Sequence, residues 1–335
     1  MTKRKSTGKA EFAGIGLAVV VEDTGAELSE TAHIVVTPPD GKVTVYTGSS
    51  PHGQGQETTL RELCARVLGL APSRISVAWG DTDTIPSGVG TFGSRSIVTG
   101  GSAVVKASRE LRKQILATAA ALYHENKAKI DIRDDSLILT NTSGDGLRKL
   151  ESFSNFVKLA GKCFDNFAEF RLNSLTFASG AHLCAMIIDR ETLRAQITKY
   201  IAVDDCGKII NKMIVDGQIH GGVVHGIGNA ILEKLVYGEN GQPLTTNLLD
   251  YTIPTSLDSP HVEVISLETP SVVSLNGAKG VGESGTIGAL PAVFNAINDA
   301  LSAFSRTRLD MAPATPDEIY AALCVNDNDA RFQSL

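Results

Sequence analysis

Three glycine-rich loops, each leading into a helical pattern, constrain this chain more than any other feature of its sequence. They cover residues 53–57, 88–95 and 277–285. A helix N-terminus presents unpaired N–H groups with a partial positive charge, and glycine lets an anion approach the backbone closely. These loops are also rich in side-chain donors, which favours a binding site for an anionic cofactor over three unrelated turns.

Two of the loops contain the pattern G-x-G-x-x-G, at Gly88/Gly90/Gly93 and at Gly280/Gly282/Gly285. A Rossmann dinucleotide site needs a strand directly before this pattern. The residues that precede both loops are not strand-like, so an ordinary nicotinamide-binding dehydrogenase is disfavoured. The sequence also lacks a P-loop and a G-x-S-x-G nucleophile elbow.

The periodicity of apolar residues predicts a mixed α+β architecture, with mixed sheets and packed helices. Strands are expected at 14–22, 32–37, 42–46, 74–79, 129–132, 137–140, 170–177, 182–188, 194–203 and 262–267. Helices are expected at 57–68, 102–123, 152–160, 216–235, 289–304 and shortly after residue 315, followed by a polar tail. A length of 335 residues suggests about two domains.

Charge and composition exclude several classes of protein. The net charge is −6 and no basic stretch follows residues 1–5, which disfavours a nucleic-acid-binding protein. No signal peptide and no run of about 18 apolar residues is present, so we expect a cytoplasmic protein without a membrane span. The five cysteines form no C-x-x-C pair, which argues against a disulfide scaffold or an iron–sulfur cluster held by this chain.

Individual residues leave alternatives open. Glu283 stands at a helix entrance between Gly282 and Ser284. It could simply complement the helix dipole, or it could act as a general base with open space in front of it. Cys206 is more readily explained as a structural cysteine. The histidines share no metal-ligand spacing, and we predict no protein-held metal.

Six motifs follow one another along the chain: GSSPHGQGQET (48–58), GDTD (80–83), GTFGSRS (90–96), VDDCG (203–207), DGQIHGG (216–222) and GAKGVGES (277–284). Their order is the one found in the molybdenum hydroxylases, the group of xanthine dehydrogenase, aldehyde oxidase and aerobic carbon monoxide dehydrogenase. The chain resembles this family, and especially the carbon monoxide dehydrogenase large subunit.

The resemblance covers only the C-terminal part of the family's catalytic subunit. It implies two molybdopterin-binding subdomains, residues 1–170 and residues 171–335, the second carrying the active-site glutamate. It further implies that the chain is one part of a split catalytic subunit; a truncated gene is the other possibility.

The resemblance also assigns roles to residues. Glu283 corresponds to the catalytic glutamate, the base that activates a hydroxyl group for attack on a substrate carbon. One departure from the family is Gln56, where many relatives have histidine. The implied cofactor contacts are Gln54, Gly55, Thr91, Phe92, Gly93, Ser94, Arg95, Cys206, Asn211, Gln218, Lys279, Gly280 and Val281.

The implied cofactor is molybdenum bound by molybdopterin cytosine dinucleotide, with the metal held by the pterin dithiolene and shared with a partner subunit. The implied partners are an N-terminal molybdopterin-binding subunit, a 2Fe-2S subunit and an FAD subunit, and the implied activity is oxidation or hydroxylation of a small carbon substrate. A catalytically inactive structural fragment, or a truncated homologue, is the alternative.

Overall fold

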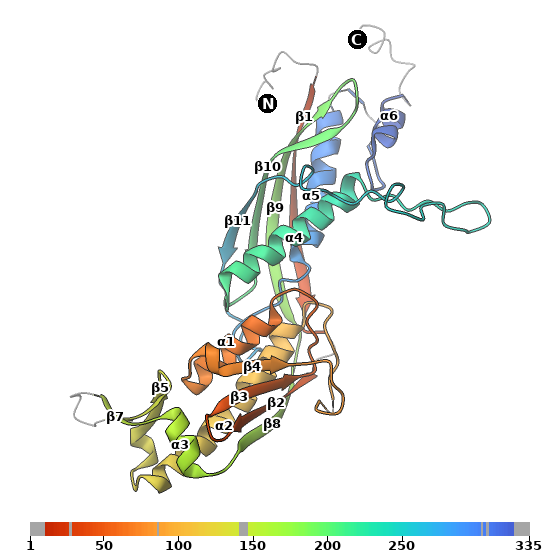
Figure 1. Ribbon diagram of the computed structural model, residues 1–335. Coiled ribbons are helices and arrows are strands. Elements are labelled where there is room, and N and C mark those ends of the chain that lie inside the picture. The colour runs from red at the N-terminus through yellow and green to blue at the C-terminus, as the bar shows by residue number, and fades with distance from the viewer. Residues whose placement is uncertain are drawn as a thin grey trace.

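The computed structural model describes residues 11–26, 29–85, 87–140, 147–302, 304–305 and 308–324. Two units follow one another along an elongated molecule, each with a sheet and its own helices (Figure 1). This confirms the predicted α+β class with mixed sheets. The polar tail predicted after the last helix lies outside the described residues.

The first unit is built on a four-stranded sheet of order β4-β3-β2-β8. Its β3 and β4 strands are parallel and the other pairs antiparallel. Alternate residues of β2 and β3, such as Ile34 and Val45, are fully buried and pack with Leu68 and Leu111 from the helices. The elements are β2 (Ser29–Thr37), β3 (Lys42–Thr47), β4 (Ile75–Ala78), β8 (Phe164–Arg171), α1 (Gln56–Leu68) and α2 (Gly101–Leu122).

A small antiparallel sheet extends the far end of this unit. It has the order β5-β6-β7, and helix α3 follows it directly. Strand β7 was not predicted, because its residues LRKLES carry no apolar alternation. The elements are β5 (Ile130–Arg133), β6 (Ser136–Thr140), β7 (Leu147–Ser152) and α3 (Phe153–Ala160).

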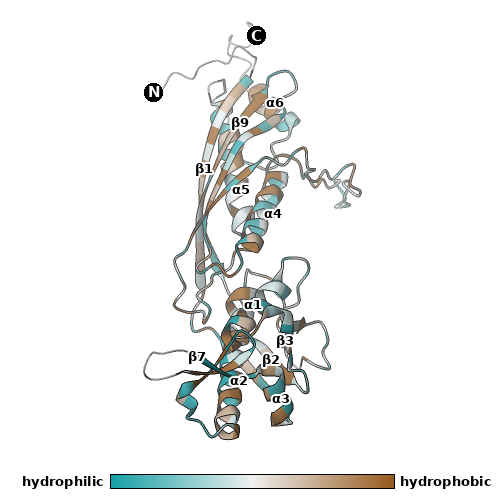
Figure 2. Ribbon diagram, turned by 60° about the vertical axis from the view of Figure 1, so that its left-hand side comes forward, coloured by the Kyte–Doolittle hydropathy of each residue, from teal (hydrophilic) through white to brown (hydrophobic). Residues whose placement is uncertain are grey.

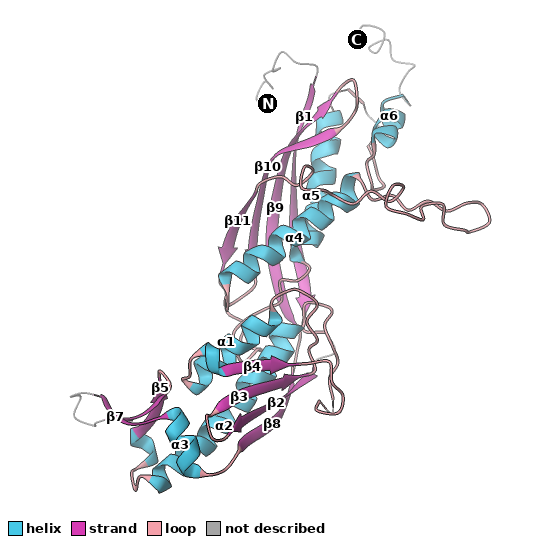
Figure 3. Cartoon of the chain, in the orientation of Figure 1, coloured by secondary structure: helices cyan, strands magenta, loops and turns pink. Residues whose placement is uncertain are grey.

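The second unit has a four-stranded sheet of order β1-β9-β10-β11 with α4 and α5 packed on one side (Figure 2). Only β10 and β11 are parallel. Between α4 and β11, residues 232–261 form a long loop that projects from the molecule (Figure 3). The elements are β1 (Glu11–Thr24), β9 (Thr176–Asp189), β10 (Ala195–Asp205), β11 (Val262–Leu267), α4 (Lys212–Ile231), α5 (Ser284–Leu301) and α6 (Pro316–Cys324).

Strand β1 comes from the start of the sequence but lies in the second unit. It pairs with β9 over its whole length, from Glu11 opposite Asp189 to Thr24 opposite Thr176. Helix α5 packs so closely on it that a Cβ at Gly16 would lie 2.0 Å from the carbonyl oxygen of Ala292. The division into 1–170 and 171–335 therefore stays a prediction. Residues 11–24 belong to the first of these ranges by sequence but pair with strand β9 of the second unit.

The structure corrects one predicted strand. Residues 170–177 are not continuous, because β8 ends at Arg171 in one sheet and β9 begins at Thr176 in the other. The turn formers Asn173 and Ser174 lie in the crossing segment, and short polar side chains of this kind favour turns.

Helix α5 begins earlier than predicted, at Ser284 instead of Ala289. The prediction treated Gly285 and Gly288 as loop residues. Both are helical, and close packing explains why they are glycine: a Cβ would lie 2.7 Å from the Ile219 carbonyl oxygen at Gly285 and 2.7 Å from His182 Nδ1 at Gly288. The earlier start places Glu283 directly at the helix N-terminus.

Candidate functional site

The three glycine-rich loops meet at a pocket of about 290 Å³ between the two units. Its lining comes from both units, with α1 and the second loop on one side and α4 and the third loop on the other. Twelve of the predicted site residues line it: Gln54, Thr91, Phe92, Ser94, Arg95, Cys206, Asn211, Gln218, Lys279, Gly280, Val281 and Glu283.

Two predicted contacts do not line the pocket. Gly55 is the N-cap of α1 and adopts φ +77°, and a Cβ there would lie 2.8 Å from Ile214. Gly93 adopts φ +55° and lies against Ala26. Both shape the loops through a backbone conformation that favours glycine.

The third loop joins the two units. Asn276 donates from its side-chain amide to the Ile97 carbonyl in the first unit, at 2.6 Å. On the other side, the Lys279 N–H donates to the Cys206 carbonyl at 2.7 Å and the Gly280 N–H donates to Thr24 Oγ1 at 3.2 Å. The position of Glu283, three residues further on, is therefore fixed by both units.

A close approach of the second and third loops sets the wall of the pocket. A Cβ at Gly280 would lie 2.2 Å from the Ser94 carbonyl oxygen and 2.4 Å from Ser94 Cβ. Ser94 itself has a left-handed backbone, with φ +47°. Because only glycine tolerates this approach, Gly280 is required by packing at this position.

The first and second loops are joined through Gln56, which donates to Thr91 Oγ1 at 3.3 Å; Ser96 Oγ donates to the same oxygen at 3.1 Å. Gln54 accepts from the His52 N–H at 2.7 Å through its side-chain oxygen. The residue that departs from the family pattern thus has a local role, since it ties the two loops together.

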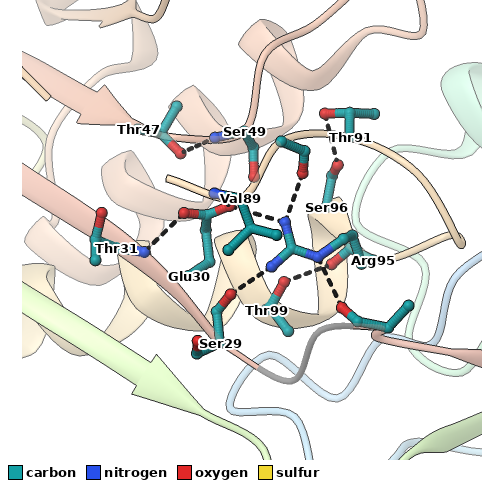
Figure 4. A network of polar contacts seen from close by, with 12 residues as sticks. Ser29, Glu30, Thr31, Thr47, Ser49, Val89, Thr91, Arg95, Ser96 and Thr99 are labelled. Atoms are coloured by element: carbon teal, nitrogen blue, oxygen red, sulfur yellow. Dashed lines mark hydrogen bonds and ion pairs between the residues drawn. The ribbon is translucent and has the colours of Figure 1, made fainter. Parts of the chain in front are cut away.

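The Arg95 side chain is fully buried and does not offer its donors to a ligand (Figure 4). Nη1 pairs with Glu30 Oε2 at 2.8 Å and donates to the Gly90 carbonyl at 2.5 Å, while Nε donates to the Ala26 carbonyl at 2.8 Å. Nη2 donates to the Ser29 carbonyl. Arg95, one of the implied cofactor contacts, therefore anchors the second loop to β2 through its guanidinium and does not direct these donors into the pocket.

Cys206 and Lys279 lie side by side on the opposite wall. Burial, together with the negative charge of Asp205, raises the pKa of the Cys206 thiol to about 11, so it is a thiol at neutral pH. Lys279 Nζ lies 3.4 Å from Asp205 Oδ1, which balances its charge. Neither residue is an activated nucleophile or a free cation.

Asn211 has structural partners for both halves of its amide. Its oxygen caps α4 by accepting from the Ile214 N–H at 3.2 Å, and its nitrogen donates to Glu62 Oε1 of α1 at 2.7 Å. It lines the pocket and also connects the two units. Gln218 lies half-buried on α4, about two turns further along the helix.

Glu283 is exposed at the pocket and occupies the N-cap position of α5 without a side-chain capping hydrogen bond. Glu283 lines the pocket next to Gly282, where a Cβ would lie 3.3 Å from Ser94 Oγ. A carboxylate in such a place is favoured by the helix N-terminus and accessible to a bound molecule. The geometry supports its assignment as a base.

Sequence reasoning missed two buried carboxylates behind the pocket, Glu22 and Glu30. Both lie at inward positions of strands, where the alternation of burial leads one to expect apolar residues. A charged residue at an expected inward position of a strand was therefore the sequence signal that could have identified them. Within the described residues, no group of three or more His, Cys, Asp or Glu could hold a metal ion, and no helix has the length and apolar character needed to cross a membrane.

Comparisons with known proteins show which family this chain is similar to. Residues 1–260 match the family model described as "Molybdopterin cofactor-binding domain". The nicotine 6-hydroxylase large subunit of Paenarthrobacter nicotinovorans is 34% identical, over 93% of this chain and 40% of that protein. The carbon monoxide dehydrogenase large chain of Hydrogenophaga pseudoflava is 31% identical, over 96% of this chain and 42% of that protein.

Solved structures agree with this likeness. Quinoline 2-oxidoreductase from Pseudomonas putida 86 superposes with a TM-score of 0.86 at 33% identity, over 94% of this chain and 42% of that chain. The chain thus spans about two-fifths of the length of these relatives.

Proposed function

This chain belongs to the molybdenum hydroxylase family, and from that premise we propose that it is the part of a catalytic subunit that holds a molybdopterin cofactor and carries the active-site base, Glu283. The observation that carries the proposal is the position of Glu283 at the mouth of a pocket built by all three glycine-rich loops. The reaction is the oxidation or hydroxylation of a small carbon substrate.

The residues present fit an anionic pterin dinucleotide in part. The wall at Ser94 and Gly280 brings backbone close to a ligand, and the amides of Gln54 and Gln218 can donate to it. The pocket, at about 290 Å³, lies at the small end of the range of about 300–1,000 Å³ for ligand sites. It can therefore enclose only part of the cofactor, which supports a site completed by another polypeptide.

We assign a separate role in the reaction to the cofactor, to Glu283 and to Lys279. When bound, the molybdenum cofactor supplies the two-electron oxidation and the oxygen that is transferred. With the cofactor bound, Glu283 would accept the proton released in the reaction, and Lys279 to Val281 would form the wall beside the reacting atoms. The ammonium of Lys279 is directed to Asp205 and serves to hold the third loop.

An exposed apolar sheet face supports the proposal that a partner subunit covers this chain. Helices α4 and α5 cover one side of the second sheet, and β1 presents Ile15, Leu17, Val19 and Val21 on the other. Apolar side chains in a continuous row are typical of an interface. We assign this face to the N-terminal molybdopterin-binding subunit, with 2Fe-2S and FAD subunits carrying electrons away.

Purification of the native complex tests this function. We expect the chain to co-purify with these partners, with molybdenum and with a dinucleotide form of the pterin, the cytosine dinucleotide. The measurements are subunit masses, a metal assay and identification of the nucleotide released by acid hydrolysis. A complex that contains molybdenum and only a mononucleotide pterin would reject the dinucleotide assignment.

Purified alone, the chain is expected to self-associate through the β1 face and to lack activity. Val19→Lys should shift it toward monomer, because Val19 is 76% exposed in the centre of that row. The matched control is Val272→Lys, since Val272 is 99% exposed in a loop outside the sheet. Sedimentation velocity gives the measurement. An active, molybdenum-loaded monomer purified without partners would overturn the proposed division of the cofactor site.

A further inference from the structure

A row of buried polar side chains lies on the inner face of the second sheet, beneath α5. His182 Nδ1 lies 2.9 Å from Tyr200 Oη, and His182 Nε2 lies 3.2 Å from Asp204 Oδ2. All three side chains are at most 2% exposed. Glu22 lies on the same face of β1, two residues along the strand from Val20, which is level with Asp204. Polar groups therefore extend across this face toward the pocket.

Glu22 is the member of this row that lacks a hydrogen-bond partner. It is 5% exposed, and neither of its carboxylate oxygens has a partner among the described residues. Asp204 Oδ1 and the buried Ser94 Oγ are likewise unpartnered. An unpaired carboxylate in the interior is costly unless it is protonated, so the position favours a carboxyl group that takes up and releases a proton.

The direction of Glu22 connects it with the active-site loop. Side chains two residues apart in a strand share a face, so Glu22 points to the same side as Thr24. Thr24 accepts the Gly280 N–H, and Ser94 lies over Gly280. Glu22 thus faces the junction of the loops that carry Ser94 and Glu283.

The electrostatic surroundings of Glu22 match this placement. The pKa of Glu22 is raised to about 7. Burial is the main cause, the nearby Ser94 hydroxyl lowers the pKa, and the negative charges of Glu283, Asp23 and Asp204 raise it. His182, paired with Asp204, is a further titratable group on this face. A proton on Glu22 is therefore favoured while Glu283 carries its negative charge.

We propose that Glu22 stores the proton that Glu283 removes during turnover, and that the Ser94 hydroxyl, which hydrogen-bonds to neither carboxyl in this structure, turns onto both to pass the proton. This rests on the proposed role of Glu283 as the base. The Glu283 O–H bond breaks as its proton passes to Ser94 Oγ, and the Ser94 proton passes to Glu22, which becomes a neutral carboxylic acid. Glu283 is then a carboxylate again. When product leaves and solvent reaches Glu283, the same steps in reverse release the proton.

Glu22 can receive a proton only when it is a carboxylate, and this determines the direction in which turnover changes with pH. Turnover should rise as pH increases through about 7, where Glu22 loses its proton. Glu22→Gln should lower kcat by roughly 10- to 100-fold with KM little changed and should remove this step from the pH profile. The expected loss is smaller than the about 10²–10⁴-fold typical of losing a general base. Glu22→Asp should restore part of the rate and the pH step.

The storage role predicts a spectroscopic signal that needs no turnover. We expect infrared difference spectra taken between low and high pH to show a carboxylic-acid C=O band that disappears as pH rises through about 7. The spectra are recorded on the complex both with and without cofactor. The band should be absent in Glu22→Gln and shifted in Glu22→Asp, which also identifies it if Glu22→Gln fails to assemble. Asp23→Asn, the matched control on the exposed side of β1, should keep the band with a slightly lower midpoint.

The outcomes separate the two proposals. Full turnover in Glu283→Gln overturns the proposed function, whatever Glu22 does. An inactive Glu283→Gln combined with an unchanged rate and pH profile in Glu22→Gln overturns proton storage alone. A wild-type complex in which no Glu22 carboxylic-acid band exists between pH 5 and 9 also overturns it, independently of activity.

Discussion

Glu283→Gln should lower turnover by about 10²–10⁴-fold or more while the complex stays assembled and retains its cofactor. Glutamine keeps the size and hydrogen-bonding reach of glutamate but cannot accept a proton as a carboxylate does. The substitution leaves packing intact because the Glu283 side chain is exposed and makes no capping hydrogen bond. Turnover per bound molybdenum is the measurement.

The matched control for this experiment is Glu57→Gln. Glu57 is the last residue of the first glycine-rich loop, lies in the first turn of α1 and does not line the pocket. Both substitutions remove a favourable charge from a helix N-terminus, an effect of about 0.3–1 kcal/mol. If Glu283 only complemented the helix dipole, or if the chain were an inactive fragment, the two variants would show the same turnover.

Arg95→Ala should lower the free energy of unfolding by about 3–5 kcal/mol, since it leaves the carboxylate of Glu30 buried without its counter-charge. Glu30 is 1% exposed, and its remaining partners are the N–H groups of Thr31 and Val89. Molybdenum occupancy should fall as well, because the second loop loses its anchor to β2. Thermal and denaturant unfolding of the assembled protein give the measurement.

Two further variants distinguish anchoring from ligand binding at Arg95. Arg148→Ala, at a mostly exposed arginine paired at 3.7 Å with Glu125, should cost less than about 1 kcal/mol. Arg95→Lys should recover part of the loss caused by Arg95→Ala, because an ammonium keeps a counter-charge for Glu30 but cannot reproduce the several directed contacts of the guanidinium. A stable Arg95→Ala protein that loses only its nucleotide would restore the direct cofactor role.

Much of this molecule follows from local patterns. The predicted hairpin of β2 and β3, the helices α1 and α2 and strand β11 agree with the structure to within three residues. Their apolar spacing and terminating turns lie within one stretch of sequence, so no distant contact is needed to specify them. The same local pattern made Glu283 a candidate base beside a helix-dipole role, and the family resemblance assigned it as the base.

The sequence by itself therefore determined the loops, the helices that follow them and the candidate base. Only the tertiary structure decided which donors face the pocket. Arg95 and Glu30 are 65 residues apart, and Glu22 lies more than 250 residues from Glu283. A guanidinium in a glycine-rich loop binds whichever acceptors surround it, and a carboxyl group in a strand titrates according to its burial. Both surroundings are created when β1 crosses into the second sheet and the second loop closes onto β2, because electrostatic and hydrogen-bond energies depend on distances in space rather than on separation along the chain.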